Sequence, residues 1–95
     1  MNFKGDAQMI EQKAISGNLV LSELSKQSFP NIKSYLTIKT IDLQGVKNID
    51  SAGIAYLAQI KTTYSTIKFI NGSEKISILS ALYGVDFLFT ERGFQ

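Results

Sequence analysis

The chain has 95 residues, of which 44% are hydrophobic and 19% are charged, values typical of one globular domain rather than of a disordered segment. Ten basic and eight acidic residues give a net charge of +2, and the lysines are scattered, a pattern that does not favour nucleic-acid binding. Cysteine and histidine are absent, which excludes disulfides, thiolate nucleophiles, histidine-based triads and nearly all transition-metal sites. No apolar run approaches the roughly 20 residues that span a bilayer, so we expect a cytoplasmic chain without direct membrane insertion.

The N-terminal third gives the weakest pattern. Residues 1–4 and 9–16 are expected to form two short strands joined by the turn-prone pair Gly5-Asp6. The leucines that follow, among polar residues, predict a short amphipathic helix that ends before Pro30.

The middle of the chain gives stronger signals. Residues 35–43 are rich in β-branched and aromatic side chains and predict a strand. Residues 44–48 are expected to form a loop, and residues 51–64 predict an amphipathic helix. The expected inner stripe of this helix comprises Gly53, Leu57, Ile60 and Tyr64.

The last third begins with a strand expected over residues 67–70. Ser73 as an N-cap and Glu74 in the first turn then predict a second helix, which Gly84 ends. Residues 85–89 are expected to be extended. The expected inner stripe of the second helix comprises Ile76, Leu79, Leu82 and Tyr83. Strands that alternate with helices predict an α/β fold with parallel neighbours in a mixed sheet.

The Asp50-Ser51 pair lies where the loop passes into the first long helix. The first turn of a helix has free N–H groups and a partial positive charge, so a hydroxyl there either caps the helix or lies where an anion is tolerated. Ser51 is therefore either a plain N-cap, shared with or replaced by Asp50, or a functional surface residue. The small residues Ala52 and Gly53 either leave the backbone open to a partner or let the helix pack tightly.

Helical spacing places Tyr56 and Gln59 on the surface that begins at Ser51. An exposed tyrosine is a suitable contact residue for a partner protein. The alternative, an ordinary amphipathic side chain that half covers the domain, is equally consistent with the sequence.

Catalysis has little support in the sequence. Asp50 and Ser51 are adjacent and diverge at a helix start, and there is no histidine to act as a base. The acidic residues do not have the spacing of a calcium loop, and the glycines form neither a Walker loop nor a dinucleotide fingerprint. We therefore expect no enzymatic activity, no cofactor and no metal site.

Two segments of the chain together resemble the signature of STAS domains, IDLQGV (residues 41–46) and IDSAGI (residues 49–54). The likeness is concentrated in residues 36–58 and extends to about residue 88. It implies an α/β fold in which helices pack on a STAS-type mixed sheet of four to five strands. It also implies one STAS domain over residues 1–95, with an abbreviated N-terminal part.

Within this family, the short chain and its segment LSALYGVD (residues 79–86) look similar to the small MlaB-like subunits of Mla-type phospholipid-transport ABC transporters. Such a subunit is not catalytic. It binds the ATPase subunit and, through it, a membrane permease, in a transporter that maintains outer-membrane lipid asymmetry. The resemblance thus implies that Ser51 faces an ABC ATPase and that the protein is peripheral to the inner membrane through its partner.

Two alternatives remain within the family. An anti-sigma-factor antagonist would bind an anti-sigma serine kinase and be switched by phosphorylation of Ser51, the position at which that branch of the family is modified. A small-ligand or nucleotide-binding STAS module would need a pocket near the Asp50-Ser51 turn.

Overall fold

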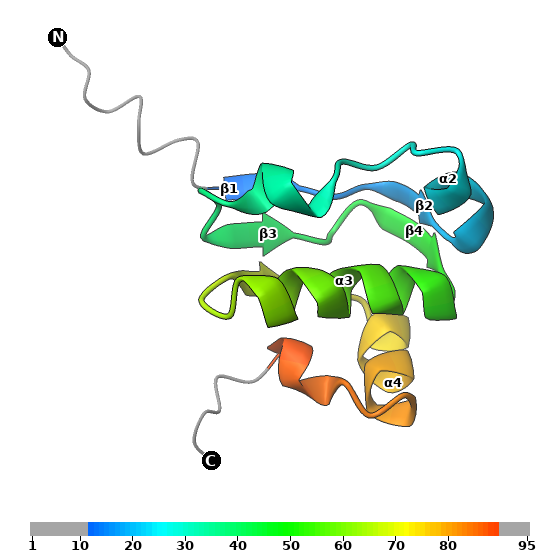
Figure 1. Cartoon of the computed structure of the whole chain (residues 1–95). Helices are drawn as coiled ribbons and strands as arrows, with labels where there is room; N and C mark the ends of the chain where they lie inside the picture. Colours follow the sequence, from blue (N-terminus) through cyan, green and yellow to red (C-terminus); the bar gives the residue numbers. More distant parts are fainter. Residues whose placement is uncertain (1–11, 90–95) are drawn as a thin grey trace, which may run out of the picture.

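A computed structural model describes residues 12–89 and shows a mixed α/β arrangement (Figure 1). The strands are β1 (Gln12–Ala14), β2 (Gly17–Leu19), β3 (Thr40–Asp42), β4 (Val46–Ile49) and β5 (Lys68–Ile70). Strands β1, β3 and β5 form a three-stranded sheet in the order β1-β3-β5, and β2 and β4 form a two-stranded sheet. All three strand pairings in this part of the chain are parallel.

The helices pack on these sheets and on one another. They are α2 (Leu21–Ser25), α3 (Ser51–Thr63), α4 (Glu74–Leu82) and two 3-10 helices, η1 (Ile32–Tyr35) and η2 (Asp86–Phe89). Helix α3 contacts α2, α4, β4 and both 3-10 helices, and it runs beside the strands in Figure 1. It is therefore the element around which the described part of the chain is arranged.

The three-stranded sheet buries one of its faces. Its parallel register places Lys13, Ile41 and Phe69 in one row, and both Ile41 and Phe69 are buried. The neighbours of Ile41 along β3, Thr40 and Asp42, are only half-buried, because successive side chains of a strand point to opposite faces. One side of the sheet therefore belongs to the core, and the other side carries more polar and exposed residues.

Helix α3 supplies a large share of the core through Ile54, Leu57 and Ile60, all buried. Burial of one such side chain contributes roughly 1.5–3 kcal/mol. The helix begins and ends within a residue of the predicted bounds. Gly53, Leu57 and Ile60 of the predicted inner stripe are buried, and Tyr64 is the half-buried C-cap.

The predicted strand over residues 35–43 is wrong in its first half, where the chain forms η1 and a turn before β3. The Asn31 side chain caps η1 by accepting from the Lys33 N–H at 2.8 Å, and the Ile38 N–H donates to the Tyr35 carbonyl. Tyr35 itself is fully buried. Its aromatic side chain marks a core position rather than a strand.

The predicted loop over residues 44–48 is also wrong, because most of it belongs to β4, which pairs with β2. The Gly17 N–H donates to the Gly45 carbonyl at 2.9 Å, and a Cβ at Gly45 would lie 2.6 Å from the Ser16 Cβ. Gly45 therefore allows a close approach of two chain segments where the sequence suggested only a turn. The single mixed sheet expected from the resemblance is likewise replaced, within residues 12–89, by two parallel sheets.

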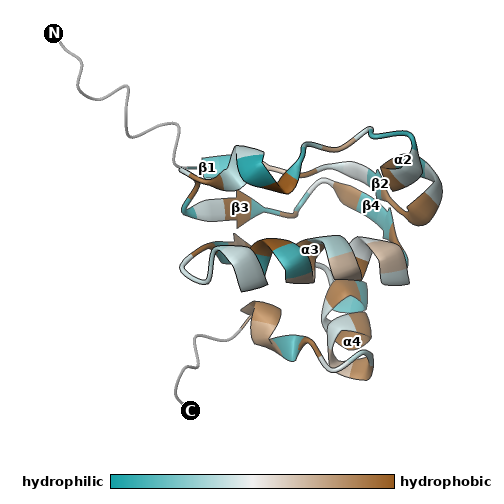
Figure 2. Cartoon of the chain, in the orientation of Figure 1, coloured by the Kyte–Doolittle hydropathy of each residue, from teal (hydrophilic) through white to brown (hydrophobic). Residues whose placement is uncertain are grey.

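The helix expected after Ser73 is confirmed as α4, but the side of the helix that faces the core differs from the predicted one. Ser73 is the N-cap of α4, and Gly84 ends the helix with φ of +75°. Leu82 and Tyr83 do not face inward; they are 71% and 49% exposed, and α4 instead buries Ile76 and the polar Ser80. Figure 2 shows that α4 and η2 are hydrophobic over most of their length, so hydropathy alone does not identify the buried side.

Two further predictions have different outcomes. The segment expected to be extended over residues 85–89 is wrong, because η2 occupies it. The strand expected over residues 1–4 and the Gly5-Asp6 turn lie outside the described residues.

Candidate functional site

The Asp50 carboxylate caps α3 and also reaches a second helix. Its Oδ1 accepts from the Gly53 N–H at 3.1 Å, and its Oδ2 accepts from the Leu21 N–H at 3.0 Å. Leu21 is the first residue of α2, and the N-cap residue of that helix, Val20, makes no side-chain capping bond. One carboxylate therefore satisfies backbone donors at the starts of two helices that are far apart in the sequence.

The same bonds explain the acidity of this group. Donation from the Leu21 N–H is the main cause that lowers the pKa of Asp50 below its usual value of 3.8; partial desolvation opposes it, and further backbone bonds, including that of Gly53, assist it. Hydrogen bonds to the charged form favour ionisation. Asp50 is therefore a carboxylate at neutral pH.

Ser51 is the first residue of α3 and is exposed. The capping bond comes from Asp50, so of the two interpretations of Ser51 the N-cap role belongs to its neighbour. The Ser51 hydroxyl thus stands at a helix start without being the group that caps it.

A groove of about 490 Å³ runs along the outer side of α3 from Ser51. We call it the α3–Tyr83 groove, and its lining comprises Ser51, Ile54, Ala55, Ala58, Gln59, Thr62, Thr63, Tyr83 and Val85. Every one of these residues is uncharged. From Ser51 to Thr62 the helix rises by about 17 Å, so the groove follows three turns of α3.

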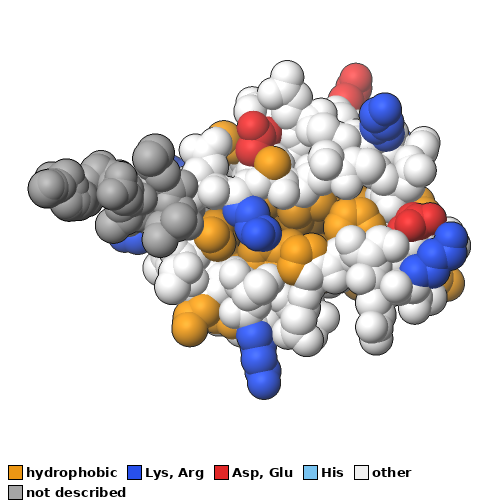
Figure 3. Space-filling view, turned by 90° about the horizontal axis from the view of Figure 1, so that it is seen from above, with side chains coloured by type: hydrophobic (Ala, Val, Ile, Leu, Met, Phe, Trp, Pro, Cys, Tyr) orange, Lys and Arg blue, Asp and Glu red, His pale blue; other side chains and the backbone are white. Residues whose placement is uncertain are grey.

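A second groove, of about 410 Å³, lies on the other side of the exposed ridge of α3. We call it the α2–α3 groove, and its lining comprises Leu24, Gln27, Phe29, Pro30, Asn31, Ile32, Ala52, Ala55, Tyr56 and Gln59. Ala55 and Gln59 line both grooves. Figure 3 shows the molecule from above, with hydrophobic side chains exposed across the middle of this face and charges of both signs scattered around them.

Tyr56 lies deeper than the sequence suggested. Its hydroxyl donates to the Pro30 carbonyl at 2.5 Å and lies 2.9 Å from the Tyr35 hydroxyl, which therefore donates to it. The ring is half-buried, lies 6.0 Å from the Phe29 ring and lines the α2–α3 groove. Tyr56 thus joins the segment before η1 to α3, and its half-buried side chain matches the interpretation of a residue that half covers the domain.

Burial fixes the protonation of this tyrosine pair. Desolvation is the main cause that raises the pKa of both Tyr35 and Tyr56 above the usual value of 10.0. For Tyr56 the neighbouring Tyr35 raises the pKa further, and both hydroxyls stay protonated at neutral pH. The two hydroxyls form hydrogen bonds with each other and, through Tyr56, with the Pro30 carbonyl.

The remaining predicted site residues divide between core and surface. Gly53 is buried, and a Cβ there would lie 2.1 Å from the Leu19 carbonyl oxygen, which supports tight packing and not access by a partner. Ala52 is half-buried on the wall of the α2–α3 groove, and Gln59 is exposed between the two grooves.

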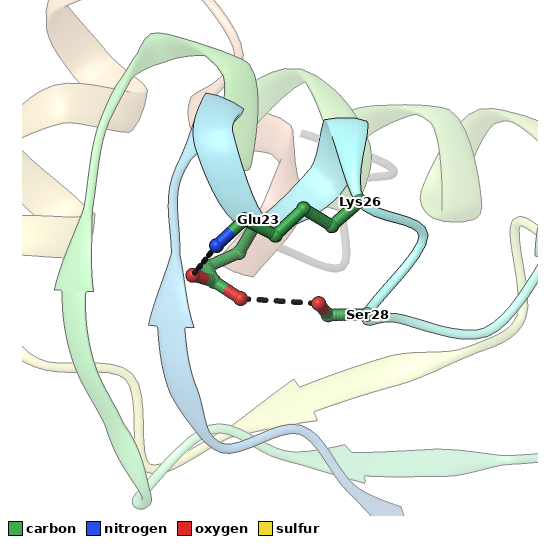
Figure 4. Close-up of polar contacts among 3 residues, drawn as sticks. All are labelled: Glu23, Lys26 and Ser28. Atoms are coloured by element: carbon green, nitrogen blue, oxygen red, sulfur yellow. Dashed lines mark hydrogen bonds and ion pairs between the residues drawn. The ribbon is translucent and has the colours of Figure 1, made fainter.

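A local polar cluster of Glu23, Lys26 and Ser28 lies on α2 and the turn that follows it (Figure 4). The Glu23 carboxylate lies 3.4 Å from the Lys26 ammonium and accepts from the Ser28 hydroxyl at 3.0 Å. Gln27, between them, has a positive φ of 61°. A surface ion pair stabilises by at most about 1 kcal/mol, so this cluster shapes the turn after α2 more than it stabilises the fold.

Comparison with known proteins does not place the chain in a family. No family model matches it, and no curated protein shows significant similarity to it.

The arrangement is an exposed surface without charged lining residues. Within residues 12–89 no group of three or more His, Cys, Asp or Glu side chains could hold a metal ion, and no helix is long and apolar enough to cross a membrane. The surface instead combines an exposed serine, an uncharged helix ridge and two grooves with apolar walls. Charged residues are depleted at the centre of protein interfaces, and this surface shares that property.

The sequence predicted that Ser51 and Gln59 lie on the surface and that Asp50 lies at the helix start, but it did not predict two links between distant segments. The bond between Asp50 and the Leu21 N–H joins residues 29 apart, and the bond between Tyr56 and the Pro30 carbonyl joins residues 26 apart. An aspartate directly before an apolar helical pattern does signal an N-cap. Nothing in the local pattern signals the second bond of the same carboxylate.

Proposed function

We propose that this chain is a STAS-type adaptor subunit without catalytic activity, which binds and supports the ATPase of a phospholipid-transport ABC transporter. The observation that carries the proposal is the position of Ser51. Ser51 is exposed at the first residue of α3, at the end of an uncharged groove, while Asp50 does the capping. Because the Ser51 hydroxyl does not cap α3 and lies beside a groove three helical turns long, it is suited to contact a partner protein.

The chemistry of the surface supports an adaptor rather than an enzyme. The lining of both grooves is uncharged, so the surface offers apolar contact and neutral hydrogen-bonding groups in place of an acid, a base or an activated nucleophile. Through its ATPase partner the chain would sit beneath a permease at the inner membrane. There it would support a transporter that maintains outer-membrane lipid asymmetry.

The test is binding of the purified ABC ATPase by Ser51→Glu, with Ser77→Glu as the matched control on an exposed position of α4. A carboxylate at Ser51 faces a partner surface fitted to a small hydroxyl, so we expect at least a tenfold loss of affinity, about 1.4 kcal/mol. Ser77→Glu should bind like the unsubstituted protein. Equal affinity of the two variants would remove Ser51 from the interface.

The exposure of Ser51 also favours a second candidate, an anti-sigma-factor antagonist switched by phosphorylation. A phosphate adds roughly 1.5 to 2 negative charges, which a helix start tolerates within the protein but which a partner surface fitted to a hydroxyl excludes. Purification from the native cell with gentle detergent discriminates between the two. Co-purification of an ABC ATPase and a permease favours the adaptor, whereas a serine kinase and a phosphate on Ser51 favour the switch.

A further inference from the structure

Helix α2 has few attachments to the rest of the molecule. It is five residues long, none of its residues is fully buried, and its first residue, Leu21, is 60% exposed. Leu24 is the residue of α2 that packs against the hydrophobic core. The Glu23 and Leu24 N–H groups donate to the Val20 carbonyl within the same turn and so do not tie α2 to another element.

The Leu21 N–H is the backbone donor of α2 that reaches across to α3, through the Asp50 carboxylate at 3.0 Å. The other oxygen of the same carboxylate accepts from the Gly53 N–H inside α3. Asp50 therefore joins the starts of the two helices directly, at the point where the chain passes from β2 into α2.

This link matters for the shape of the α2–α3 groove. Leu24 and the following Gln27 form one wall, and Ala52 and Tyr56 of α3 form the opposite wall. Any change in the position of α2 relative to α3 changes the width of this groove. The Glu23–Lys26 cluster orders the turn after α2 but makes no bond to α3.

We propose that Asp50 is a positioning residue for the α2–α3 groove. Its carboxylate holds α2, as a loosely packed wall, against the start of α3. The proposal deepens the proposed function and rests on it for the partner, because Ala55 and Gln59 belong both to this groove and to the α3–Tyr83 groove. The effect on α2 itself needs no partner.

The variant that separates the two bonds is Asp50→Ser. Serine is a good N-cap and can keep the bond to the Gly53 N–H, but its one hydroxyl lies closer to the backbone and does not replace the second carboxylate oxygen. Asp50→Ala removes both bonds. Ser73→Ala is the matched control, because it removes the cap of α4, where the Ser73 hydroxyl accepts from the Ile76 N–H at 3.2 Å.

The measurement is amide hydrogen exchange of the isolated protein. Asp50→Ser should speed exchange over residues 21–25 about tenfold, the effect of losing one hydrogen bond to a charged group, while the amides of α3 stay protected. Ser73→Ala should leave residues 21–25 unchanged. Unchanged exchange of α2 in Asp50→Ser, or equal acceleration in Ser73→Ala, would overturn the proposal.

A binding measurement then separates positioning from general stability. Asp50→Ser and Ser73→Ala should be compared at temperatures where both are fully folded, and only Asp50→Ser should lose affinity for the ABC ATPase. If the unsubstituted protein does not bind the ATPase, the proposed function fails, and the exchange result still decides whether Asp50 positions α2. If Asp50→Ser loosens α2 but binds normally, the α2–α3 groove is not part of the interface, and the claim that Asp50 positions this groove for the partner is overturned.

Discussion

The starts of α3 and α4 look alike in the sequence and are built differently. At α4, Ser73 caps its own helix, and its hydroxyl accepts from an N–H three residues ahead. At α3, Asp50 caps the helix and at the same time satisfies a donor of α2, which leaves the following Ser51 exposed. An N-cap can therefore be purely local or can join two elements, and only the second kind links the start of one helix to another part of the fold.

The comparison of the two helices is tested most strongly by the same substitution on each. Leu57 of α3 is fully buried, whereas Leu82 of α4 is 71% exposed. Leu57→Asp would bury an unpaired charge and should unfold the domain, with a loss of more than about 4 kcal/mol. Leu82→Asp should change the free energy of unfolding by no more than about 0.5 kcal/mol, as measured by denaturant titration. A folded Leu57→Asp protein would mean that the side of α3 carrying Leu57 does not face the core.

Gly53 tests how tightly α3 packs near its start. In an exposed helix, replacing glycine by alanine stabilises by about 1 kcal/mol. Here the new Cβ would lie 2.1 Å from the Leu19 carbonyl oxygen, so Gly53→Ala should instead destabilise by about 1–3 kcal/mol. A rise in the melting temperature of this variant would show that α3 is not held against β2 as described.

The N-caps Asp50 and Ser73 should contribute differently to the free energy of unfolding. Asp50→Ala removes two hydrogen bonds to a charged acceptor and should cost about 2 kcal/mol, whereas Ser73→Ala removes one bond to a hydroxyl and should cost about 1 kcal/mol. Urea titrations of both variants measure the difference. Equal losses would indicate that the Leu21 bond contributes nothing to stability.

The smallest expected effect concerns pH. The pKa of Asp50 is lowered in the folded protein, mainly by the Leu21 N–H, so its stabilising contribution is fully present above the usual value of 3.8 and is lost as pH falls through the lower folded pKa. The stability difference between the unsubstituted protein and Asp50→Asn should therefore shrink on acidification below pH 3.8. The deficit of Ser73→Ala should stay constant over the same range, since a hydroxyl does not titrate there. A pH-independent difference for Asp50→Asn would contradict the ionic character of the double cap.

Features that depend on nearest neighbours along the chain could be predicted from the order of residues alone. The period of apolar residues fixed α3 to within a residue, Ser73 and Gly84 marked the ends of α4, and the absence of histidine and cysteine removed whole classes of chemistry. Capping, helical periodicity and glycine conformation depend on interactions within a few residues. These features can therefore be recognised in the sequence before the tertiary structure is known.

Features that depend on distant partners are set by contacts that form only when the chain folds. Tyr35 became a core residue of a 3-10 helix instead of a strand residue, and residues 46–49 became a strand because β2 lies beside them. Leu82 faces outward because Ile76 and Ser80 take the inner side of α4. The second hydrogen bond of Asp50 also exists only because folding brings Leu21 to it. In each case the stabilising free energy comes from a contact between segments far apart in the chain. The local sequence pattern does not predict that contact.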